Sequence, residues 1–504
     1  MNAPCQVGQK AAPANIMLNS VRPRKFLHGR TQILSLLALE TTMEMTDNTA
    51  DRPAEVIHPR PATHPALVAS ASGTYSTLND QRTVLDACGV SMIGHGDETV
   101  KFAIQEQLQK VAYAHPFMHT TSPPQDLASF LCQGIPSLEP FKVYFSSSGS
   151  EAVDSAMKLV VAFHRANNNP QRTHFVSRQR SYHGNTIGSM CLGDFPRRKQ
   201  PYDEAFNRLD VSFVSPAYAY RQQGSDESEV QYSNRLINEI EAEFCRIGPQ
   251  NVAAFVAETV GGSTAGCITA PEGYFEGVRR VCNKYGVLLL LDEIMCGNGR
   301  TGTYFAFESE GDFVPDIVVL GKGLSGGYLP LAATLIQHSV YQVIQSAGGF
   351  IHGHTYQAHP VSCAAALAVQ RVIRSTGCLA HCKRLGDRMG LKLRSLFTDL
   401  EFVGDIRGRG LFWAIEFVAN KRLKMPLAED FAFGSKLRQF AHDSGVAILS
   451  GSGTADGHAG DHIIFAPPLT IEQAELDWMI DITREAYLRT EKVYKAQRYS
   501  GDAQ

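Results

Sequence analysis

Short apolar runs alternate with longer, helix-like patterns along the chain from Ser72 onward, and this alternation predicts an α/β fold. The clearest unit spans residues 271–292. Pro271 is typical of a first helical turn, and Gly286 is expected to end the helix. The run 287–291 is apolar at every position, as in a parallel-sheet strand that helices cover on both faces. One face of the expected helix carries Tyr274, Phe275, Val278, Val281, Cys282 and Tyr285.

Polar side chains follow three of the expected strands at the point where each strand ends. Asp292 comes directly after the apolar run 287–291, and Glu258 comes directly after the run 253–257. The third run, 317–320, leads through one glycine to Lys322. Because ligands of open α/β sheets bind at the carboxyl ends of the strands, these three side chains are expected to share one site.

Lys322 and Asp292 together indicate a particular cofactor chemistry. A lysine is ordinarily a solvated surface charge, but Lys322 follows an apolar run and stands between Gly321 and Gly323. A desolvated lysine loses proton affinity and can attack an aldehyde. Asp292 could be a helix cap or a buried ion-pair partner, yet a carboxylate at this edge also suits a protonated pyridine nitrogen. An aldehyde and a pyridine ring are the reactive parts of pyridoxal 5′-phosphate.

A phosphate site is predicted where residues 145–152 read as a strand, a glycine turn and a helix start. The free N–H groups at Gly149 and Ser150 favour an anion, although a Ser-Gly-Ser sequence is also ordinary N-capping. Tyr182, in the sequence Tyr182-His183-Gly184, offers an aromatic ring that could stack on a flat cofactor. Each of these two signals is weak by itself.

With these motifs in place, the chain resembles the class III (ornithine/ω-amino acid type) aminotransferases of the fold-type-I pyridoxal-phosphate enzymes. The resemblance extends from about residue 72 to residue 488, and the step from Asp292 to Lys322 matches the family spacing. The motifs that carry it are Gly94-His95-Gly96, Ser148-Gly149-Ser150-Glu151-Ala152, Tyr182-His183-Gly184, Leu291-Asp292-Glu293, Gly299-Arg300-Thr301-Gly302, Gly321-Lys322-Gly323, His354-Thr355-Tyr356, Arg407-Gly408 and Ala466-Pro467-Pro468-Leu469.

The resemblance implies a role for each site residue. Lys322 would form the Schiff base with pyridoxal 5′-phosphate and carry the proton between substrate and cofactor, with Asp292 at the ring nitrogen. Thr355 would reach the phosphate of the neighbouring subunit, which makes the active form a homodimer. No residue is expected to bind a metal. The cofactor-binding set would comprise Gly149, Ser150, Tyr182 (stacked on the ring), His183, Glu258 (near Asp292), Asp292, Lys322 and Thr355.

The same resemblance implies how the chain is divided. A large domain over residues 116–375 would carry a seven-stranded, mostly parallel sheet and bind the cofactor. A smaller α+β domain would combine residues 66–115 with residues 376–490, and 491–504 would form a tail. Residues 1–65, with prolines near their end, would be a disordered extension and linker.

The expected substrate pocket departs from the family pattern. Members that use amino acids often carry an arginine close to the Pro-Pro-Leu segment that clamps a carboxylate, but residues 447–465 contain none. A glutamate that often accompanies this arginine is replaced by Ser263. Arg300, Arg407 or Arg409 could substitute, and the glycines at 451, 453, 457 and 460 predict a flexible loop. We expect a pocket rebuilt for a less anionic substrate.

Composition limits the partners and the compartment. The 504 residues carry a formal net charge of −3, which gives no electrostatic reason to expect nucleic acid or membrane binding. No apolar run approaches the roughly 20 residues of a membrane helix. Eleven cysteines in so long a chain do not form a disulfide framework, which favours a reducing compartment. We expect a cytoplasmic protein; residues 1–44, which carry basic but no acidic side chains up to residue 39, could alternatively be a mitochondrial transit peptide.

These observations predict an aminotransferase that moves an amino group between an amine or amino acid and a carbonyl acceptor by ping-pong chemistry. An epimerase or racemase and a decarboxylating relative remain open, because the same lysine and cofactor serve those reactions. A catalytically silent dimer that acts as a scaffold is the alternative from another class. The sequence alone identifies neither the amino donor nor the acceptor.

Overall fold

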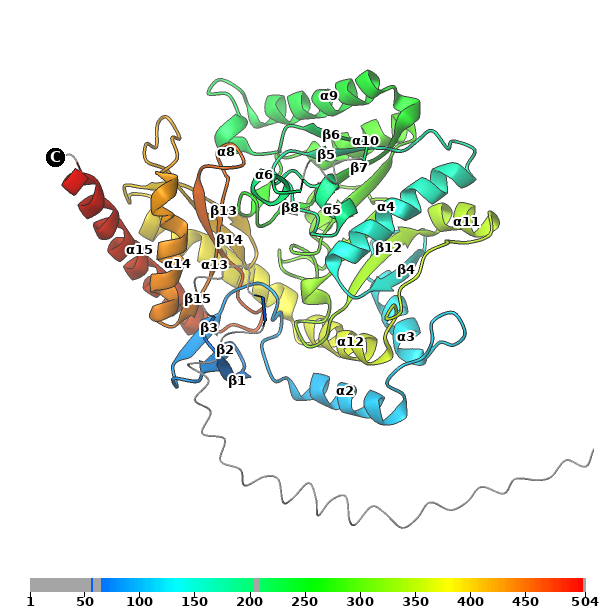
Figure 1. Cartoon of the computed structure of the whole chain (residues 1–504), viewed down its shortest axis with the longest axis horizontal. Helices are drawn as coiled ribbons and strands as arrows, with labels where there is room; N and C mark the ends of the chain where they lie inside the picture. Colours follow the sequence, from blue (N-terminus) through cyan, green and yellow to red (C-terminus); the bar gives the residue numbers. More distant parts are fainter. Residues whose placement is uncertain (1–55, 58–64, 203–208, 502–504) are drawn as a thin grey trace, which may run out of the picture. The chain divides into compact units, whose positions relative to one another are not determined.

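A seven-stranded sheet forms the centre of residues 66–504 in the computed structural model (Figure 1). The structure describes residues 56–57, 65–202 and 209–501, and the chain divides into two units, 1–65 and 66–504. Strand β12 runs antiparallel to both its neighbours, and the four pairs from β11 to β6 are parallel. The predicted mostly parallel sheet is therefore confirmed. Its order is β4 (Phe141–Ser146), β12 (Ala332–Gln337), β11 (Ile317–Leu320), β10 (Leu288–Asp292), β7 (Val252–Glu258), β5 (His174–Arg178) and β6 (Val211–Val214).

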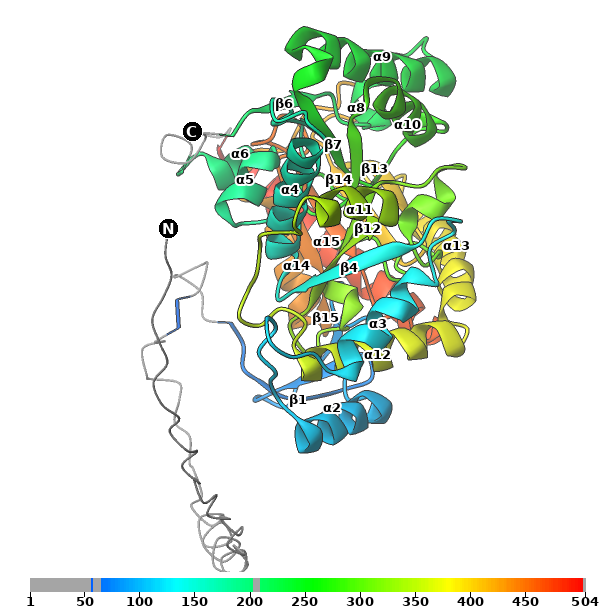
Figure 2. The same cartoon turned by 90° about the vertical axis from the view of Figure 1, so that its right-hand side faces the viewer.

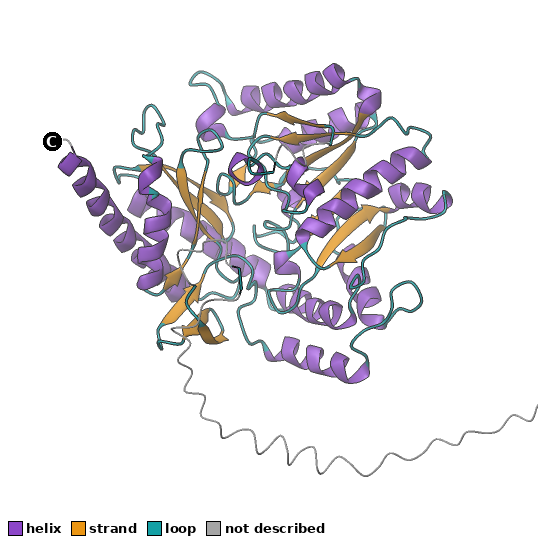
Figure 3. Cartoon of the chain, viewed as in Figure 1, coloured by secondary structure: helices purple, strands orange, loops and turns teal. Residues whose placement is uncertain are grey.

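Strand β10 is apolar throughout because helices cover the sheet on both faces. Leu288 and Leu290 pack into one core cluster with helix α4 (Gly149–Ala166) and helix α11 (His338–Ser346). Leu289 and Leu291 point to the opposite face and pack into the cluster that contains α9 (Glu229–Ile247) and α10 (Tyr274–Tyr285). Side chains of a strand alternate between faces, so only a doubly covered strand needs an apolar residue at every position. Figure 3 shows the strands of this sheet between the two groups of helices.

The boundaries around α10 differ slightly from the sequence prediction. The helix begins at Tyr274, after Gly273 in the left-handed region at φ 75°, so Pro271 lies before the helix and not in its first turn. Gly286 ends the helix at φ 63°, as predicted, and the strand runs from 288 to 292. A glycine in the left-handed conformation leaves no mark in the hydrophobic pattern. The sequence prediction therefore placed the start of this helix too early.

Two smaller sheets bring distant parts of the chain together. Strand β15 (Val446–Ala447) pairs in parallel with β3 (Thr83–Asp86), which extends the sheet of β1 (Val68–Ser72) and β2 (Tyr75–Leu78). A four-stranded antiparallel sheet contains β13 (Val403–Arg409), β14 (Phe412–Phe417), β17 (Asp461–Phe465) and β16 (Leu449–Ser452). The domain bounds 66–115, 116–375 and 376–490 stay a prediction. Long helices accompany these sheets: α13 (Cys378–Phe397), α14 (Phe433–Asp443) and α15 (Gln473–Gly501).

Further helices complete residues 66–504. Helix α12 (Pro360–Ser375) packs against α2 (Glu98–Lys110) and α3 (Ser122–Cys132), as Figure 2 shows. Short elements lie along the chain between β5 and β10 of the central sheet: α5 (Ile187–Leu192), α6 (Pro196–Lys199), α8 (Ala219–Gln222) and the paired strands β8 (Val260–Gly261) and β9 (Ile268–Thr269). Within the described ranges, no helix has the length and apolar character needed to cross a membrane. The cysteines described there are all free, and no group of metal-binding side chains is found among the described residues.

Candidate active site

A cavity of about 180 Å³ opens at the carboxyl edge of the central sheet, where strands β7 and β10 end. Seven of the eight predicted site residues line it, and Thr355 does not. The sheet topology therefore brings together side chains that are up to 173 residues apart, from 149 to 322. The lining comprises Gly149, Ser150, Tyr182, His183, Gly184, Glu258, Val260, Ser263, Asp292, Ile294, Met295, Cys296 and Lys322.

Lys322 reaches this cavity from the first turn after β11. Its backbone lies in the left-handed region at φ 37°, a strained conformation for a lysine, and strain of this kind gathers at functional sites. A Cβ at Gly323 would meet Cε of Met92, so a side chain at this flanking position would force Met92 to move. Burial lowers the pKa of Lys322, while the charges of Asp292 and Glu258 act in the opposite direction. The result is an amine that is more readily neutral than a surface lysine.

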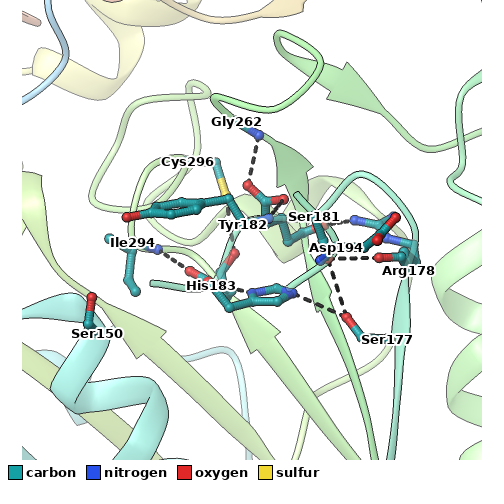
Figure 4. A network of polar contacts seen from close by, with 12 residues as sticks. Ser150, Ser177, Arg178, Ser181, Tyr182, His183, Asp194, Gly262, Ile294 and Cys296 are labelled. Atoms are coloured by element: carbon teal, nitrogen blue, oxygen red, sulfur yellow. Dashed lines mark hydrogen bonds and ion pairs between the residues drawn. The ribbon is translucent and has the colours of Figure 1, made fainter. Parts of the chain in front are cut away.

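Asp292 is buried at the end of β10 and is held by two hydrogen bonds. One carboxylate oxygen accepts from the backbone N–H of Ile294 at 3.0 Å, and the other lies 2.8 Å from Nδ1 of His183. Nε2 of His183 lies 3.4 Å from the hydroxyl oxygen of Ser177, so the imidazole stands between a carboxylate and a hydroxyl (Figure 4). An Asp292 carboxylate can only accept, so Nδ1 carries the proton in this pair. The arrangement fixes the direction in which Asp292 presents its charge.

Glu258 organises the loop that carries Tyr182. One of its oxygens accepts from the backbone N–H of Gly262 at 2.8 Å, and the other accepts from the backbone N–H of Tyr182 at 3.2 Å. Both contacts are drawn in Figure 4. Burial raises the pKa of Glu258, and the nearby Asp292 charge adds to this effect. The position of the Tyr182 ring thus depends on a residue 76 positions further along the chain.

Helix α4 begins at the opposite side of the cavity. The hydroxyl of Ser148 caps this helix by accepting from the N–H of Glu151 at 3.3 Å. The hydroxyl of Ser150 accepts from the N–H of Asn185 at 3.1 Å and keeps its own hydrogen for a ligand. A Cβ at Gly149 would lie 2.8 Å from Cδ1 of Ile294, so glycine is required where the backbone passes the cavity. Free N–H groups of a first helical turn and a hydroxyl donor together suit an anion such as phosphate.

These features fit pyridoxal 5′-phosphate part by part. The amine of Lys322 suits the aldehyde, the buried carboxylate of Asp292 suits the ring nitrogen, and the start of α4 suits the phosphate. The half-buried ring of Tyr182 offers an aromatic surface in the same cavity. The donor set therefore matches the cofactor predicted from the sequence.

Comparisons with known proteins agree with this geometry. The family model described as "Aminotransferase class-III" matches residues 57–487. The chain belongs to the class III aminotransferases. An uncharacterized aminotransferase of Schizosaccharomyces pombe is 38% identical over 446 residues, which cover 88% of this chain and 96% of that protein. Vanillin aminotransferase of Capsicum frutescens is 34% identical over 441 residues, 85% of this chain and 92% of that one.

Solved structures give the same result. The omega transaminase from Pseudomonas jessenii in complex with PMP has a TM-score of 0.81 and 30% sequence identity, and the match covers 87% of this chain and 97% of that one. The family is dependent on pyridoxal phosphate, and these relatives are transaminases by name. Amino-group transfer is thereby favoured over the epimerase, the decarboxylating relative and the silent scaffold.

The three arginines considered as substitutes for the missing clamp are used elsewhere in this aminotransferase. Arg300 is completely buried and donates to the carbonyl oxygens of Leu411 and Pro467. Arg409 pairs with Glu310 at 2.8 Å. None of these arginines lines the cavity. The suggestion that one of them substitutes at the cavity finds no support in their positions.

Arg407 belongs to a buried polar cluster beside β14. It pairs with Glu416 at 2.8 Å and with Asp405 at 2.6 Å, and it donates to the carbonyl oxygen of Gly266 at 2.6 Å. Glu416 also pairs with Arg221. The guanidinium of Arg407 is therefore satisfied by a structural network.

The glycine-containing segment after residue 447 is more regular than predicted. Residues 449–452 form strand β16, which pairs with β17, and the turn beyond it is held by backbone hydrogen bonds between Gly453 and Gly460. Asp456 accepts from the N–H groups of His458 and Ala459 within this turn. Part of the segment predicted as a flexible loop is therefore strand, because pairing with β17 supplies order that glycine content alone does not reveal.

The sequence did not reveal two features of the site. The bond between His183 and Asp292 depends on how residues 179–183 turn after β5, although the Tyr-His-Gly motif had marked His183. Arg198 on α6 places its guanidinium carbon 4.9 Å from the centre of the Tyr182 ring. The only sequence signal for Arg198 is the basic run Arg197-Arg198-Lys199.

Proposed function

We propose that this aminotransferase binds pyridoxal 5′-phosphate in the cavity at the carboxyl edge of the sheet and uses Lys322 as its reactive amine. The observation that carries this proposal is the convergence of a desolvated lysine, a buried carboxylate and a helix N-terminus on one cavity. When bound, the cofactor supplies an aldehyde that accepts the amino group and a ring that withdraws electrons from the carbon that loses its proton.

The chain's own residues then have distinct tasks. Nζ of Lys322, whose pKa is lowered by burial, accepts the proton from the substrate carbon and returns it during the transfer. Asp292 holds a proton at the ring nitrogen, and its bond to His183 keeps the carboxylate oriented. Gly149 and Ser150 bind the phosphate, and Glu258 positions the Tyr182 ring against the cofactor.

For the substrate, we propose an amine or an ω-amino compound rather than a compound with an α-carboxylate clamped at the reacting carbon. No arginine lines the cavity, and the carboxylates of Glu258 and Asp292 lie in its wall. A carboxylate buried there without a cationic partner would be costly. Relatives named vanillin aminotransferase and gamma aminobutyrate transaminase 2 support this substrate class.

The test compares donors that differ only in an α-carboxylate. The enzyme loaded with pyridoxal 5′-phosphate is mixed with an α-amino acid or with the matching amine that lacks the α-carboxylate. Conversion of the cofactor to its amino form is followed by absorbance, with no acceptor present. The amine is expected to react at least as fast; a strong preference for the α-amino acid would overturn the proposed substrate class, and no conversion with any donor would overturn the proposed function.

The proposed assembly is a homodimer in which Thr355 contacts the cofactor phosphate of the partner subunit. Thr355 is exposed and does not line the cavity of its own chain. Large apolar side chains lie exposed near it in sequence or in ring contact, an arrangement typical of a protein interface. They are Ile351, Tyr356 and Tyr113, whose ring lies 6.0 Å from that of Tyr356.

The compartment remains a proposal as well. Cytoplasm is our expectation, with the mitochondrion as the alternative if residues 1–44 are a transit peptide. Those residues lie outside the described structure. One relative, a probable gamma-aminobutyrate transaminase of Oryza sativa, is named as mitochondrial.

A further inference from the structure

Helix α6 carries three consecutive cationic side chains, and two of them are committed to structural contacts. Arg197 donates to the hydroxyl of Ser452 at 2.6 Å and pairs with Glu429 at 3.0 Å. The ammonium group of Lys199 is buried and lies 3.4 Å from the carbonyl oxygen of Cys191. Arg198 differs, since no hydrogen bond or ion pair joins its side chain to any residue that the structure describes; the contacts of its guanidinium there are with aromatic rings.

These ring contacts place Arg198 beside the active-site cavity. Its guanidinium carbon lies 4.9 Å from the centre of the Tyr182 ring, and Tyr182 lines the cavity. The same carbon lies 5.4 Å from the centre of the Phe195 ring, which meets Tyr182 edge-on. The positive charge also acts at the reactive amine: burial is the main cause of the lowered Lys322 pKa, and Arg198 contributes in the same direction.

The charges that line the cavity indicate a role for Arg198 in binding an anionic group of the substrate. The wall contains the carboxylates of Asp292 and Glu258, and Lys322 is the one lysine or arginine among the lining residues. Lys322 is occupied by its own chemistry, so a substrate carboxylate needs a cation from outside this lining. A guanidinium that has no anionic partner among the described residues, and that already lies next to Tyr182, can bind a carboxylate with two parallel hydrogen bonds.

We propose that Arg198 binds a carboxylate at the end of the substrate that is remote from the reacting amino group. The inference rests on the proposed function, because the reacting carbon must lie within reach of Lys322. Arg198 is exposed and lies beyond the lining residues. A substrate that extends from Lys322 to Arg198 carries its amino group at one end and its carboxylate at the other, which defines an ω-amino carboxylate.

The experiment measures a preference between two donors. One is a straight-chain ω-amino carboxylate, and the other is the alkylamine of the same length without the carboxylate. For each, the rate of cofactor conversion is measured against donor concentration with the full-length enzyme loaded with pyridoxal 5′-phosphate, without acceptor. The ratio of the two second-order rate constants isolates the carboxylate, because any change in the Tyr182 environment affects both donors.

Arg198→Gln is expected to lower this ratio about ten- to hundredfold, the equivalent of one charge-assisted contact. Arg198→Gln is expected to raise the concentration of the ω-amino carboxylate needed for half-saturation, with little change in the limiting rate. Arg198→Lys keeps the charge without the bidentate geometry and is expected to lower the ratio less. Arg197→Gln is the matched control on the same helix and is expected to leave the ratio unchanged.

The possible results separate this inference from the proposed function. Conversion of both donors with a ratio that Arg198→Gln leaves unchanged overturns the role of Arg198. An equal fall of the ratio in Arg197→Gln overturns it too, because the effect would then follow the general charge of α6. Absence of conversion with any donor in the unaltered enzyme overturns the proposed function and this inference with it. An exposed arginine replaced by glutamine is not expected to affect folding, which circular dichroism checks.

Discussion

Lys322 is subject to two opposing influences, and their balance explains how an ordinary amine becomes reactive. Removal from water disfavours the charged form, while the carboxylates of Asp292 and Glu258 favour it. The pKa falls, so burial outweighs the two charges. A lysine with this balance is neutral at a lower pH than a surface lysine, yet it remains close to carboxylates that stabilise it whenever it takes up a proton.

The first prediction removes this amine. Lys322→Ala is expected to abolish turnover and the covalent bond to the cofactor, because no other lysine lines the cavity. Steady-state assays and the absorbance of the cofactor after denaturation and filtration measure the two losses. Unchanged circular dichroism would show that the fold is retained. Normal turnover of this variant would contradict the central role of Lys322.

The second prediction concerns the charge of Asp292. Asp292→Asn keeps the shape and the contact to Ile294, but it removes the charge that holds the proton of the ring nitrogen. Turnover is expected to fall about hundredfold, which corresponds to ~3 kcal/mol of transition-state stabilisation. Cofactor binding should persist through the phosphate. Titration of the variant with pyridoxal 5′-phosphate and single-turnover rates separate these effects, and near-normal rates would mean that another acid serves the ring.

The site residues differ in how far sequence could reveal them. Lys322 and Asp292 were predictable because each follows an apolar strand, and strand ends of a parallel sheet meet at one edge. The contact between His183 and Asp292 could not be predicted, since the direction of the His183 ring depends on the turn after β5 and on Ser177. Arg407 could be named from sequence only as one possible clamp, because nothing in the sequence shows that it pairs with Glu416 on the neighbouring strand β14.

Strand β16 explains in structural terms why the segment before Pro-Pro-Leu carries no arginine at residue 451. A Cβ on Gly451 would lie 2.3 Å from Cε1 of His462 and 3.0 Å from the backbone oxygen of Ser263. His462 is completely buried, so its ring has little room to move. The close contact between β16 and β17 therefore disfavours any side chain at this position.

The third prediction tests this contact. Gly451→Ala is expected to lower the free energy of unfolding by about 1–3 kcal/mol, the usual cost of overpacking. Chemical denaturation followed by circular dichroism measures the shift, with Ser450→Ala as the neighbouring control on the same strand. Equal stability of Gly451→Ala and the unaltered enzyme would show that His462 and β16 can separate.

Helices and strands were predicted well where a strand is buried on both faces. They were predicted less well where backbone conformation or strand pairing sets the bounds of the element. The doubly covered strands β10 and β11 have an apolar residue at every position apart from the terminal Asp292, and the sequence located both. The start of α10 and the strand β16 were missed. Gly273 adopts a left-handed conformation in the first case, and pairing with β17 orders a glycine-containing segment in the second. Neither conformation leaves a hydrophobic pattern.

At the scale of the whole molecule, the proposed homodimer makes its most specific demand on Thr355. This residue is exposed, lies outside the cavity of its own chain and neighbours exposed apolar side chains such as Ile351 and Tyr356. A threonine with this placement can serve an active site only if a second copy of the chain brings a cavity to it.

The fourth prediction is that Thr355 acts across a dimer interface. Thr355→Ala is expected to weaken cofactor affinity about ten- to hundredfold through loss of a hydrogen bond to phosphate, while sedimentation still reports a dimer. The decisive measurement co-expresses Thr355→Ala with Lys322→Ala under two different affinity tags and isolates the mixed dimer. If Thr355 acts across the interface, one site of this dimer combines the intact Lys322 of one chain with the intact Thr355 of the other, so activity at limiting cofactor recovers to about half that of the unaltered enzyme. If Thr355 acts within its own chain, no site has both residues and activity at limiting cofactor stays low. An active monomer in sedimentation would contradict the proposed assembly outright.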